Sequence, residues 1–338
     1  MNSSSSVSVS SSFSGIAAFN KAAGDSLRLE ILRVLAQDAY GVSELADIFQ
    51  HKQSGMSHHL KVLSEAGLVM KRREGNSIFY SRALLAAGEA LAQLHQQLYS
   101  TIDHVAITDV VLVRLQRVQE ERVEASQQFF VQQAEKFKAQ QDLIAEYPVY
   151  GDAVTDLLRN SGVVVNDLAV EVGPGAGEFL PVLARQFQRV IALDNAPTML
   201  QKAQDYCTEN TLNNVEFIGG DTHILVDSLV DGLADGLTSQ TMLANCVVMN
   251  MVLHHTPSPA DIFIDVAKCL AVDGVFIVVD LCRHDQDWAK TACGDVWLGF
   301  DPDELTRWAQ SAGLVRQRSN YLALRNGFQI QLQQFIKT

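Results

Sequence analysis

The positions of glycine and proline divide this chain of 338 residues into two parts of different character. No glycine occurs between Gly88 and Gly151, and all seven prolines lie between Pro148 and Pro302. Because both residue types interrupt helices, their absence from the middle of the chain favours a long helical segment there. At roughly 100 to 200 residues per domain, the length also fits two domains, one on each side of this segment.

Charge follows the same division. The net charge of −13 argues at first against a nucleic-acid partner. However, residues 1–104 hold nine Lys/Arg and nine Asp/Glu, whereas residues 147–338 hold twelve and twenty-three. The acidity therefore belongs to the second part of the chain, and the first part remains open to a DNA partner.

Targeting signals and cysteine usage favour a cytoplasmic protein without a membrane partner. Residues 1–18 are expected to be a disordered leader, since nine of the first fourteen residues are serine. This segment lacks the basic start and apolar stretch of a secretory signal. No apolar run reaches the roughly 18 residues that a membrane-spanning helix needs. The five cysteines are odd in number and form no CxxC pair, which argues against a disulfide framework.

Three short helices are predicted in the first part. Apolar residues at helical spacing, with Asp25 as the N-cap, predict a helix over residues 25–35. A second helix is predicted over residues 42–49. A third begins near Gln53 and closes at Gly67, a residue type that commonly ends helices. Two short helices with a tight connection are typical of a helix-turn-helix.

A basic hairpin follows these helices. Leu68 to Tyr80 predict two strands joined by Glu74-Gly75-Asn76, a hairpin that would form a wing. Between Gln50 and Arg73 five basic residues face a single acidic one, and this local excess suits phosphate contact. The polar first half of the third helix would reach base edges in a major groove. The alternative is a solvated basic turn on a protein-interaction domain. The predicted DNA-binding residues are Gln53, Ser54, Ser57, His58, His59, Lys61, Lys71, Arg72 and Arg73.

Four segments of this part carry a further signal, namely DSLRLEILRVL, VSELADIF, QSGMSHHLKVLSEAGLV and KRREGNSIFYS. Together they resemble the winged helix of ArsR/SmtB-type bacterial repressors. The resemblance implies a homodimer that binds an inverted-repeat operator in double-stranded DNA, with Leu84 to His104 as the dimer helix. Many such repressors sense metals. Here no cysteine precedes Cys207, and the adjacent Asp103 and His104 point to different faces of a helix, so we predict no metal site.

A glycine-rich loop follows a predicted strand in the second part. Residues 167–172 form a nearly continuous apolar run, and Gly173-Pro174-Gly175-Ala176-Gly177 come next. Such a loop between a strand and a helix lets the backbone approach a ligand at the carboxyl edge of a parallel sheet. The third glycine comes one residue too early for a dinucleotide fingerprint, and no Gly-Lys-Ser/Thr follows as in a Walker loop.

The remaining strands complete a parallel sheet. Two predicted strands end near Asp194 and Asp221, where carboxylates can accept hydrogen bonds from ribose and from an adenine amino group. NCVVMNMVLHH and GVFIVVDL predict two more strands, nearly continuous in apolar residues as buried parallel strands are. Alternating segments about Asn326-Gly327 predict a final hairpin. A parallel sheet that ends in an antiparallel hairpin is unusual among nucleotide-binding folds.

The motif EVGPGAGEF, the acidic Asp194, the Gly220-Asp221 pair and the VLHH loop resemble class I S-adenosylmethionine-dependent methyltransferases, from Tyr150 onward. The resemblance implies an α/β Rossmann-like seven-stranded fold and S-adenosylmethionine or S-adenosylhomocysteine as the cofactor. It also implies that the glycines shape the methionine end of the site, that Asp194 binds ribose, and that Asn250 and Met251 close over the sulfonium. The implied cofactor-binding residues are Glu171, Gly173, Gly175, Gly177, Asp194, Asn195, Asp221, Thr222, Asn250 and Met251.

The connector between the two parts covers residues 105–147, and its apolar residues fit one long helix or two. Its default role is a rigid spacer or an additional dimer contact. The segment QQFFVQQAEKFKAQQ resembles the aromatic helix that precedes many small-molecule methyltransferase cores and lies across the cofactor. That resemblance implies a connector that touches both the ligand and the DNA-binding domain.

Catalytic residues are less defined. His254, His255 and His284 are the candidates for a general base, and the methyl acceptor is unknown. The amino-methylase loop [DN]PP[YF] and a Pro-Cys nucleophile are absent, so methylation of DNA bases is not expected. Arsenite methylation needs converging thiolates. Cys282, His284 and Cys293 match no usual zinc spacing, and buried cysteine is the simpler interpretation. CRHDQDWAKTACGDVWLGFDPDEL instead resembles a stretch of fusions between such repressors and methyltransferases.

The sequence thus predicts a multi-domain chain. The favoured function is a dimeric transcriptional repressor whose second domain binds S-adenosylmethionine or S-adenosylhomocysteine as a signal, with methionine-cycle genes as targets. The alternative is an active small-molecule methyltransferase with a fused autoregulatory DNA-binding domain, and a third reading is a degenerate domain that only dimerises. The predicted segments are a serine-rich leader (1–18), a winged-helix DNA-binding and dimerisation domain (19–104), a helical connector (105–147) and a class I methyltransferase domain (148–338).

Overall fold

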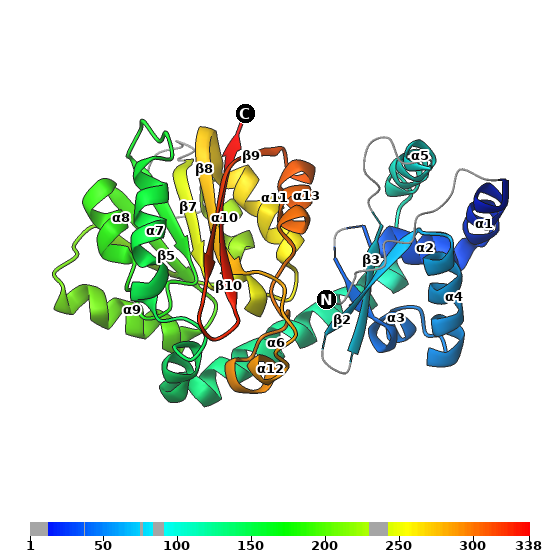
Figure 1. Ribbon diagram of the computed structural model, residues 1–338, viewed down its shortest axis with the longest axis horizontal. Coiled ribbons are helices and arrows are strands. Elements are labelled where there is room, and N and C mark those ends of the chain that lie inside the picture. The colour runs from blue at the N-terminus through cyan, green and yellow to red at the C-terminus, as the bar shows by residue number, and fades with distance from the viewer. Residues whose placement is uncertain (1–12, 37, 75–76, 84–90, 230–242) are drawn as a thin grey trace. The chain divides into compact units, whose positions relative to one another are not determined.

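A computed structural model describes residues 13–36, 38–74, 77–83, 91–229 and 243–338 of the chain. The chain forms two compact units, the first ending at Arg122 and the second beginning at Val123 (Figure 1). The division falls within helix α6 (Asp109–Gln141). The connector therefore contains one long helix, where the sequence allowed one or two.

The first unit is a winged helix-turn-helix. Its helices α2, α3 and α4 are the three predicted helices, and β2 and β3 pair antiparallel as the predicted hairpin. The turn expected at Gly75 and Asn76 lies outside the described residues. Strand β1, which the sequence did not predict, pairs with β3 and extends the sheet to the order β1-β3-β2. The elements are α1 (Phe13–Ala23), α2 (Ser26–Val34), β1 (Tyr40–Gly41), α3 (Val42–Ile48), α4 (Gln53–Glu65), β2 (Val69–Glu74), β3 (Ser77–Arg82) and α5 (Ala92–Asp103).

Helix α1 corrects one expectation about the leader. Residues 1–18 are predicted to be disordered, yet the chain is helical from Phe13 onward. Phe19 and Ala22 of this helix are buried in the core of the first unit. Burial of these apolar side chains stabilises a helix that serine content alone would not favour. Residues 1–12 lie outside the described part of the chain.

Local signals explain where the other helices begin and end. The Asp25 carboxylate accepts a hydrogen bond from the backbone N–H of Arg28 at 3.0 Å, which caps α2 as predicted. Helix α4 ends before Gly67, whose φ of +71° is the left-handed conformation that glycine adopts without strain. The apolar faces of the helices form one core. Its buried members include Ile31, Leu32, Leu45, Ile48, Leu60 and Leu63.

A partly buried arginine, Arg122, joins the first part of α6 to the helix-turn-helix. Arg122 donates to Glu44 at 2.7 Å, to Asp38 at 3.0 Å and to the carbonyl oxygen of Ala39 at 2.9 Å. Its guanidinium also lies 4.7 Å from the ring centroid of Tyr40. The Asp38 side chain is only 4% exposed. Because a buried carboxylate needs a partner, Arg122 is the anchor of this helix on the first unit.

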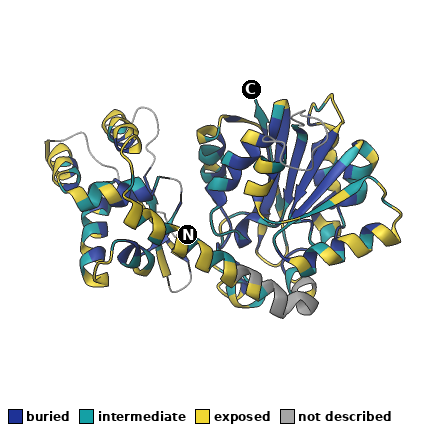
Figure 2. Ribbon diagram, turned by 180° about the vertical axis from the view of Figure 1, so that it is seen from behind, coloured by how far each residue is buried: buried dark blue, intermediate teal, exposed yellow. Residues whose placement is uncertain are grey.

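The second unit is built on a seven-stranded sheet with the order β6-β5-β4-β7-β8-β10-β9. Among the described strands, β10 alone runs opposite to the rest of the sheet, so the predicted parallel sheet with a final hairpin is confirmed. The central strands are buried on both faces (Figure 2). The strands are β4 (Leu168–Val172), β5 (Arg189–Asp194), β6 (Val215–Gly219), β7 (Ala244–Asn250), β8 (Leu270–Leu281), β9 (Leu314–Ala323) and β10 (Gln329–Lys337).

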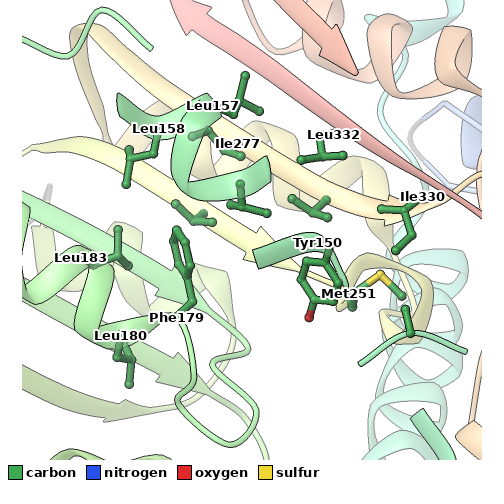
Figure 3. Close-up of a cluster of buried hydrophobic side chains, with 14 of the residues drawn as sticks. Tyr150, Leu157, Leu158, Phe179, Leu180, Leu183, Met251, Ile277, Ile330 and Leu332 are labelled. Atoms are coloured by element: carbon green, nitrogen blue, oxygen red, sulfur yellow. The ribbon is translucent and has the colours of Figure 1, made fainter. Parts of the chain in front are cut away.

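Helices cover both faces of this sheet (Figure 1). They are α7 (Tyr147–Arg159), α8 (Leu180–Gln186), α9 (Pro197–Glu209), α10 (Thr222–Leu229), α11 (Pro259–Cys269), α12 (Trp288–Cys293), α13 (Pro302–Ser311) and the 3-10 turn η1 (Leu253–His255). In the core, Leu157 and Leu158 of α7 belong to the same buried cluster as Ile277 of β8 and Leu332 of β10 (Figure 3). Among the helices of the described segments, none combines the length and apolarity that a membrane span requires.

We predict that Arg122→Ala destabilises the first unit by about 3 kcal/mol, because it removes the cation that faces the buried carboxylate of Asp38. Denaturant unfolding of the full chain measures this loss. Arg117→Ala is the matched control, since Arg117 pairs with Asp47 but the two side chains are 50% and 43% exposed. The control should lose less than about 1 kcal/mol. Equal losses in both variants would contradict the anchoring role of Arg122.

Candidate functional site

Several predicted cofactor residues meet at the carboxyl edge of the sheet. Strand β4 lies between β5 and β7, so the chain crosses the sheet in opposite directions on its two sides. Ligands bind at such a switch point in open α/β sheets, because the loops diverge there. Glu171 near the end of β4, Asp194 at the end of β5 and Asn250 at the end of β7 share this edge.

Glu171 is the most unusual residue of this edge. Its side chain is buried, and one carboxylate oxygen accepts a hydrogen bond from the Asn250 side-chain amide at 3.1 Å. Burial raises the pKa of Glu171 to about 8, although the hydrogen bond from Asn250 opposes this rise. Glu171 Oε2 and Asn250 Oδ1 have no hydrogen-bond partner within the described segments. Two buried acceptor oxygens therefore lack a donor, and a bound ammonium group would supply one.

The glycine-rich loop has the backbone that its sequence requires. Gly173, Gly175 and Gly177 have φ values of +67°, +57° and +84°, which favour glycine. A Cβ atom at Gly173 would lie 2.5 Å from the side chain of Val252, so this position has no room for one. A Cβ atom at Gly175 would meet nothing within 4 Å. Gly175 thus presents its backbone to open space, as a ligand-contacting loop needs.

The residues expected near ribose and adenine occupy different environments. Burial raises the pKa of Asp194 to about 6, and its carboxylate accepts from the backbone N–H of Ala196 at 2.8 Å. The neighbouring Asn195 is partly buried, and Asp221 is exposed just after β6. The hydroxyl of Thr222 donates to Asp265 at 2.8 Å, inside the contact between α10 and α11. This hydroxyl serves the fold, so any contribution of Thr222 to a ligand falls to its backbone.

The loop after β7 is held in a strained conformation. Met251 is buried and has a φ of +56°, which is rare for residues other than glycine. Its N–H donates to Val279 at 2.8 Å, and its carbonyl oxygen accepts from the Gln141 side chain at 3.4 Å. Strain of this kind persists only where the surroundings enforce it, and it is frequent at functional sites. The last turn of α6 therefore contacts the segment that follows Asn250.

Two aromatic neighbours were not among the predicted site residues. Phe129 of α6 packs against Ala196 and Met199, directly after Asp194. Tyr147 begins α7, and burial together with the nearby Glu171 raises its pKa to about 12. The sequence indicated an aromatic helix in the connector, which contains Phe129, but it did not single out this residue. Tyr147 carries no local signal, because its proximity to Glu171 depends on how α7 packs.

Two of the three candidate general bases, His254 and His255, lie together, with ring centroids 4.0 Å apart. His254 is fully buried, and its Nδ1 lies 2.8 Å from an Asp280 carboxylate oxygen. Burial lowers the pKa of His254, but Asp280 and Asp295 outweigh this effect and raise it to about 9. Burial and the neighbouring His254 lower the pKa of His255 well below its usual range. His284 belongs to another environment, where its ring contacts Phe328 with centroids 4.7 Å apart.

The thiols do not form the converging set that arsenite chemistry requires. Burial raises the pKa of Cys282 to about 11 and that of Cys293 to about 12, so both are protonated thiols near neutral pH. In the described part of the chain, the one group of His, Cys, Asp or Glu side chains with metal-ligand spacing is His254, His255 and Asp295. Neither cysteine belongs to it.

The predicted DNA-binding residues mostly face solvent on α4 and on the hairpin. His59 is the first exception, since it is half-buried with its Nδ1 3.8 Å from Asp25. Arg72 is a second exception and corrects the prediction. It is buried and forms an ion pair with Glu74, because alternate residues of β2 point to the inner face of the sheet. The exposed members are Gln53, Ser54, Ser57, His58, Lys61, Lys71 and Arg73.

Comparisons with known proteins divide along the same two units. A family model described as "Bacterial regulatory protein, arsR family" matches residues 25–71, and one described as "Methyltransferase domain" matches residues 156–321. An uncharacterized HTH-type transcriptional regulator of Methanocaldococcus jannaschii is 43% identical over 61 residues, which are 18% of this chain and 68% of that protein. An arsenical resistance operon repressor of Staphylococcus aureus is 36% identical over 69 residues, 20% of this chain and 66% of that protein.

Solved structures with low sequence identity match part of the chain. One is the N-methyltransferase NodS from Bradyrhizobium japonicum WM9 in complex with S-adenosyl-l-homocysteine. It is 17% identical to this chain, with a TM-score of 0.43, and the match covers 60% of this chain and 97% of that one.

The pKa of Glu171 leads to a prediction about the ligand-free protein. A carboxyl whose pKa rises from 4.5 unfolded to about 8 folded stabilises the fold at low pH. That contribution is lost as the pH rises from 4.5 to about 8. Glu171→Gln should therefore be more stable than the wild type above pH 8, by on the order of 5 kcal/mol, and similar to it near pH 4.5.

Denaturant unfolding across this pH range, without added ligand, measures the difference. Glu209→Gln is the control, since Glu209 is exposed at the end of α9 and its removal should leave the pH profile unchanged. A Glu171→Gln variant that is less stable than the wild type at every pH would show that the carboxylate is satisfied within the fold.

Proposed function

Since the chain belongs to the arsR family of bacterial regulatory proteins and carries a methyltransferase domain, we propose that it is a ligand-controlled transcriptional regulator. In this proposal the second unit binds S-adenosylmethionine or S-adenosylhomocysteine as a signal, and the signal alters operator binding by the first unit. The target genes serve the methionine cycle. The protein acts as a cytoplasmic homodimer in which α5 contributes to the dimer contact; the expected dimer-helix residues 84–90 lie outside the described residues.

Buried Glu171 is the observation that carries the cofactor part of this proposal. An ionised carboxylate is costly to bury unless a cation or several donors face it. The amino-acid end of either nucleoside carries an ammonium group with three N–H donors. That group would supply the donors that Glu171 Oε2 and Asn250 Oδ1 lack among the described residues. The fold would then keep Glu171 buried because the ligand, when bound, favours its charged form.

Other residues at the carboxyl edge of the sheet would contact the ribose and adenine parts of the nucleoside. The Asp194 carboxylate, at the end of the strand next to that of Glu171, would accept hydrogen bonds from ribose hydroxyls, with Asn195 as the next residue. The backbone at Gly175 borders open space on the loop after β4. Asp221 follows the next strand, β6, where it can accept from an adenine amino group.

The burial of His254 and His255 favours a signalling role over a catalytic one. A general base must reach the proton that it abstracts. His254 is 0% and His255 is 5% exposed, and both interact with buried carboxylates. Such side chains hold the fold and are poorly placed to meet an acceptor. The alternative, an active small-molecule methyltransferase with an autoregulatory DNA-binding domain, is supported by the match to the methyltransferase family model. S-adenosylmethionine would supply that reaction with its sulfonium-bound methyl group.

Helix α6 offers a route for coupling. Its first part is fastened to the helix-turn-helix by Arg122, and its last turn contacts the loop after β7 through Gln141 and Met251. A ligand that binds beside Asn250 would act on the same loop. Control of DNA binding requires that the ligand binds the two forms of the protein with unequal affinity. Because α6 contacts both the helix-turn-helix and the loop after β7, a change in this helix would let ligand binding and DNA binding affect each other.

Titration calorimetry with each nucleoside tests the cofactor part. The wild type should bind at least one of them, and Asp194→Ala should weaken binding by at least about tenfold, because a charged acceptor to the ribose is lost. Asp205→Ala is the control, since Asp205 is exposed on α9 of the same unit. Absence of binding by the wild type would contradict the proposed cofactor.

The regulatory part is tested with an operator selected from random duplexes. Its affinity for the full chain should change when the bound nucleoside is present and should not change for Asp194→Ala. If neither nucleoside changes the affinity for the operator, the proposal that the nucleoside acts as a signal would be contradicted. Transfer of a labelled methyl group to a small nucleophile would instead favour the enzymatic alternative.

The DNA-binding surface predicts a salt effect. Lys71→Ala and Arg73→Ala should each weaken binding to all duplexes and should reduce the slope of log affinity against log salt by about 1, because each removes one phosphate contact. Arg159→Ala on α7 is the control, since its exposed charge lies in the second unit. Fluorescence anisotropy at several salt concentrations measures the slopes. Unchanged slopes in both variants would exclude the hairpin from the DNA interface.

A further inference from the structure

A buried cluster of imidazoles and carboxylates lies beside the candidate cofactor site and has no role in the proposed function. His254 and His255 belong to η1, and Asp295 follows α12. One ligand atom from each of the three residues lies within 4.8 Å of those of the other two. The side chains are at most 6% exposed. They come from segments 40 residues apart, so tertiary structure alone brings them together.

We propose that His254, His255 and Asp295 bind one divalent transition-metal ion of the zinc class. The proposal does not depend on nucleoside binding or on DNA binding. It rests on the distances among the three residues, on one buried ring nitrogen without a hydrogen-bond partner among the described residues, and on the carboxylate that orients this ring.

The distances suit a small ion. His254 Nε2 lies 3.8 Å from Asp295 Oδ1, and His255 Nδ1 lies 3.7 Å from the same oxygen. Donors bound at about 2.0 to 2.2 Å around a tetrahedral ion are about 3.4 Å apart. Shifts of a few tenths of an ångström would therefore bring these atoms into coordination. His255 Nδ1 also lies 3.4 Å from the Gly294 carbonyl oxygen, which is long for a hydrogen bond and weakly held.

Asp280 orients the His254 ring for metal binding. Its Oδ1 lies 2.8 Å from His254 Nδ1 and also accepts from the backbone N–H of Leu281 at 2.7 Å. In the neutral ring, a proton on Nδ1 facing Asp280 leaves Nε2 with its lone pair, so a metal ion that binds Nε2 displaces the second proton of the charged imidazole. Metal-bound histidines commonly donate their other N–H to a carboxylate in this way. Nε2 of this fully buried residue has no hydrogen-bond partner among the described residues.

The donor set indicates the class of ion. Two imidazole nitrogens and one carboxylate oxygen suit Zn²⁺ and its close neighbours, and no soft thiolate belongs to the set. An ion of charge +2 would also balance the two buried carboxylates of Asp280 and Asp295. The three protein donors leave one position of a tetrahedral ion open, and an ion bound by them would tie η1 to the segment after α12. The N–H groups of Val296 and Trp297 already donate to the His254 carbonyl oxygen at 2.9 and 3.1 Å.

The test uses the tag-free full chain, stripped with a chelator and titrated with Zn²⁺. The wild type should bind one equivalent of Zn²⁺. Asp295→Asn should bind Zn²⁺ at this site at least about 100-fold more weakly. Asp280→Asn should lose about 10- to 100-fold, since it acts through His254. His284→Gln is the matched control, because His284 is a partly buried histidine of the same unit outside the cluster. Zinc should also raise the unfolding temperature of the wild type but not that of Asp295→Asn.

X-ray absorption of the zinc-loaded wild type keeps the proposal testable even if a variant fails to fold. The spectrum should show imidazole nitrogen and oxygen ligands without sulfur. Sulfur ligands, equal zinc binding by wild type and folded Asp295→Asn, or no zinc bound by the wild type would each overturn the proposal. The cluster would then be a network of hydrogen-bonded charges that stabilises the loop.

Discussion

The buried carboxylate of Glu171 is the constraint on which the second unit depends. It lies near the end of the central strand, between two neighbouring strands that also end in polar side chains. Burial disfavours its charge, and the hydrogen bond from Asn250 does not compensate. A fold selected for stability alone would place an apolar residue there. The unsatisfied oxygens, the glycine loop and the strained Met251 all occupy this edge, as expected of a region shaped for a ligand.

Helix α6 sets the corresponding constraint on the first unit. Arg122 is held by Asp38 and Glu44, so the helix that leads into the second unit is part of the core of the first. A division into compact units at Arg122 therefore cuts a helix, where a flexible linker would have been the simpler expectation for two domains.

Prediction from sequence was accurate where the signal is local. The N-cap at Asp25, the glycine at the end of α4, the hairpin and the strands of the sheet all follow from short patterns, and the structure contains them. It was inaccurate where burial depends on distant partners. Helix α1 forms because Phe19 enters a core made by later helices. Arg72 is buried because the inner face of β2 pairs it with Glu74, although its basic neighbours on either side are exposed.

The sequence by itself determined the two families, the order of the elements and the residue types at the carboxyl edge of the sheet, since periodicity, turn residues and glycine spacing are written in consecutive positions. Tertiary structure alone decided which of those residues meet. Glu171 and Asn250 are 79 residues apart, and His254 lies 26 residues from Asp280 and 41 from Asp295. The reason is physical: hydrogen bonds and ligand geometry act over a few ångströms in space. Parallel strands bring distant segments to a common edge that no local pattern records.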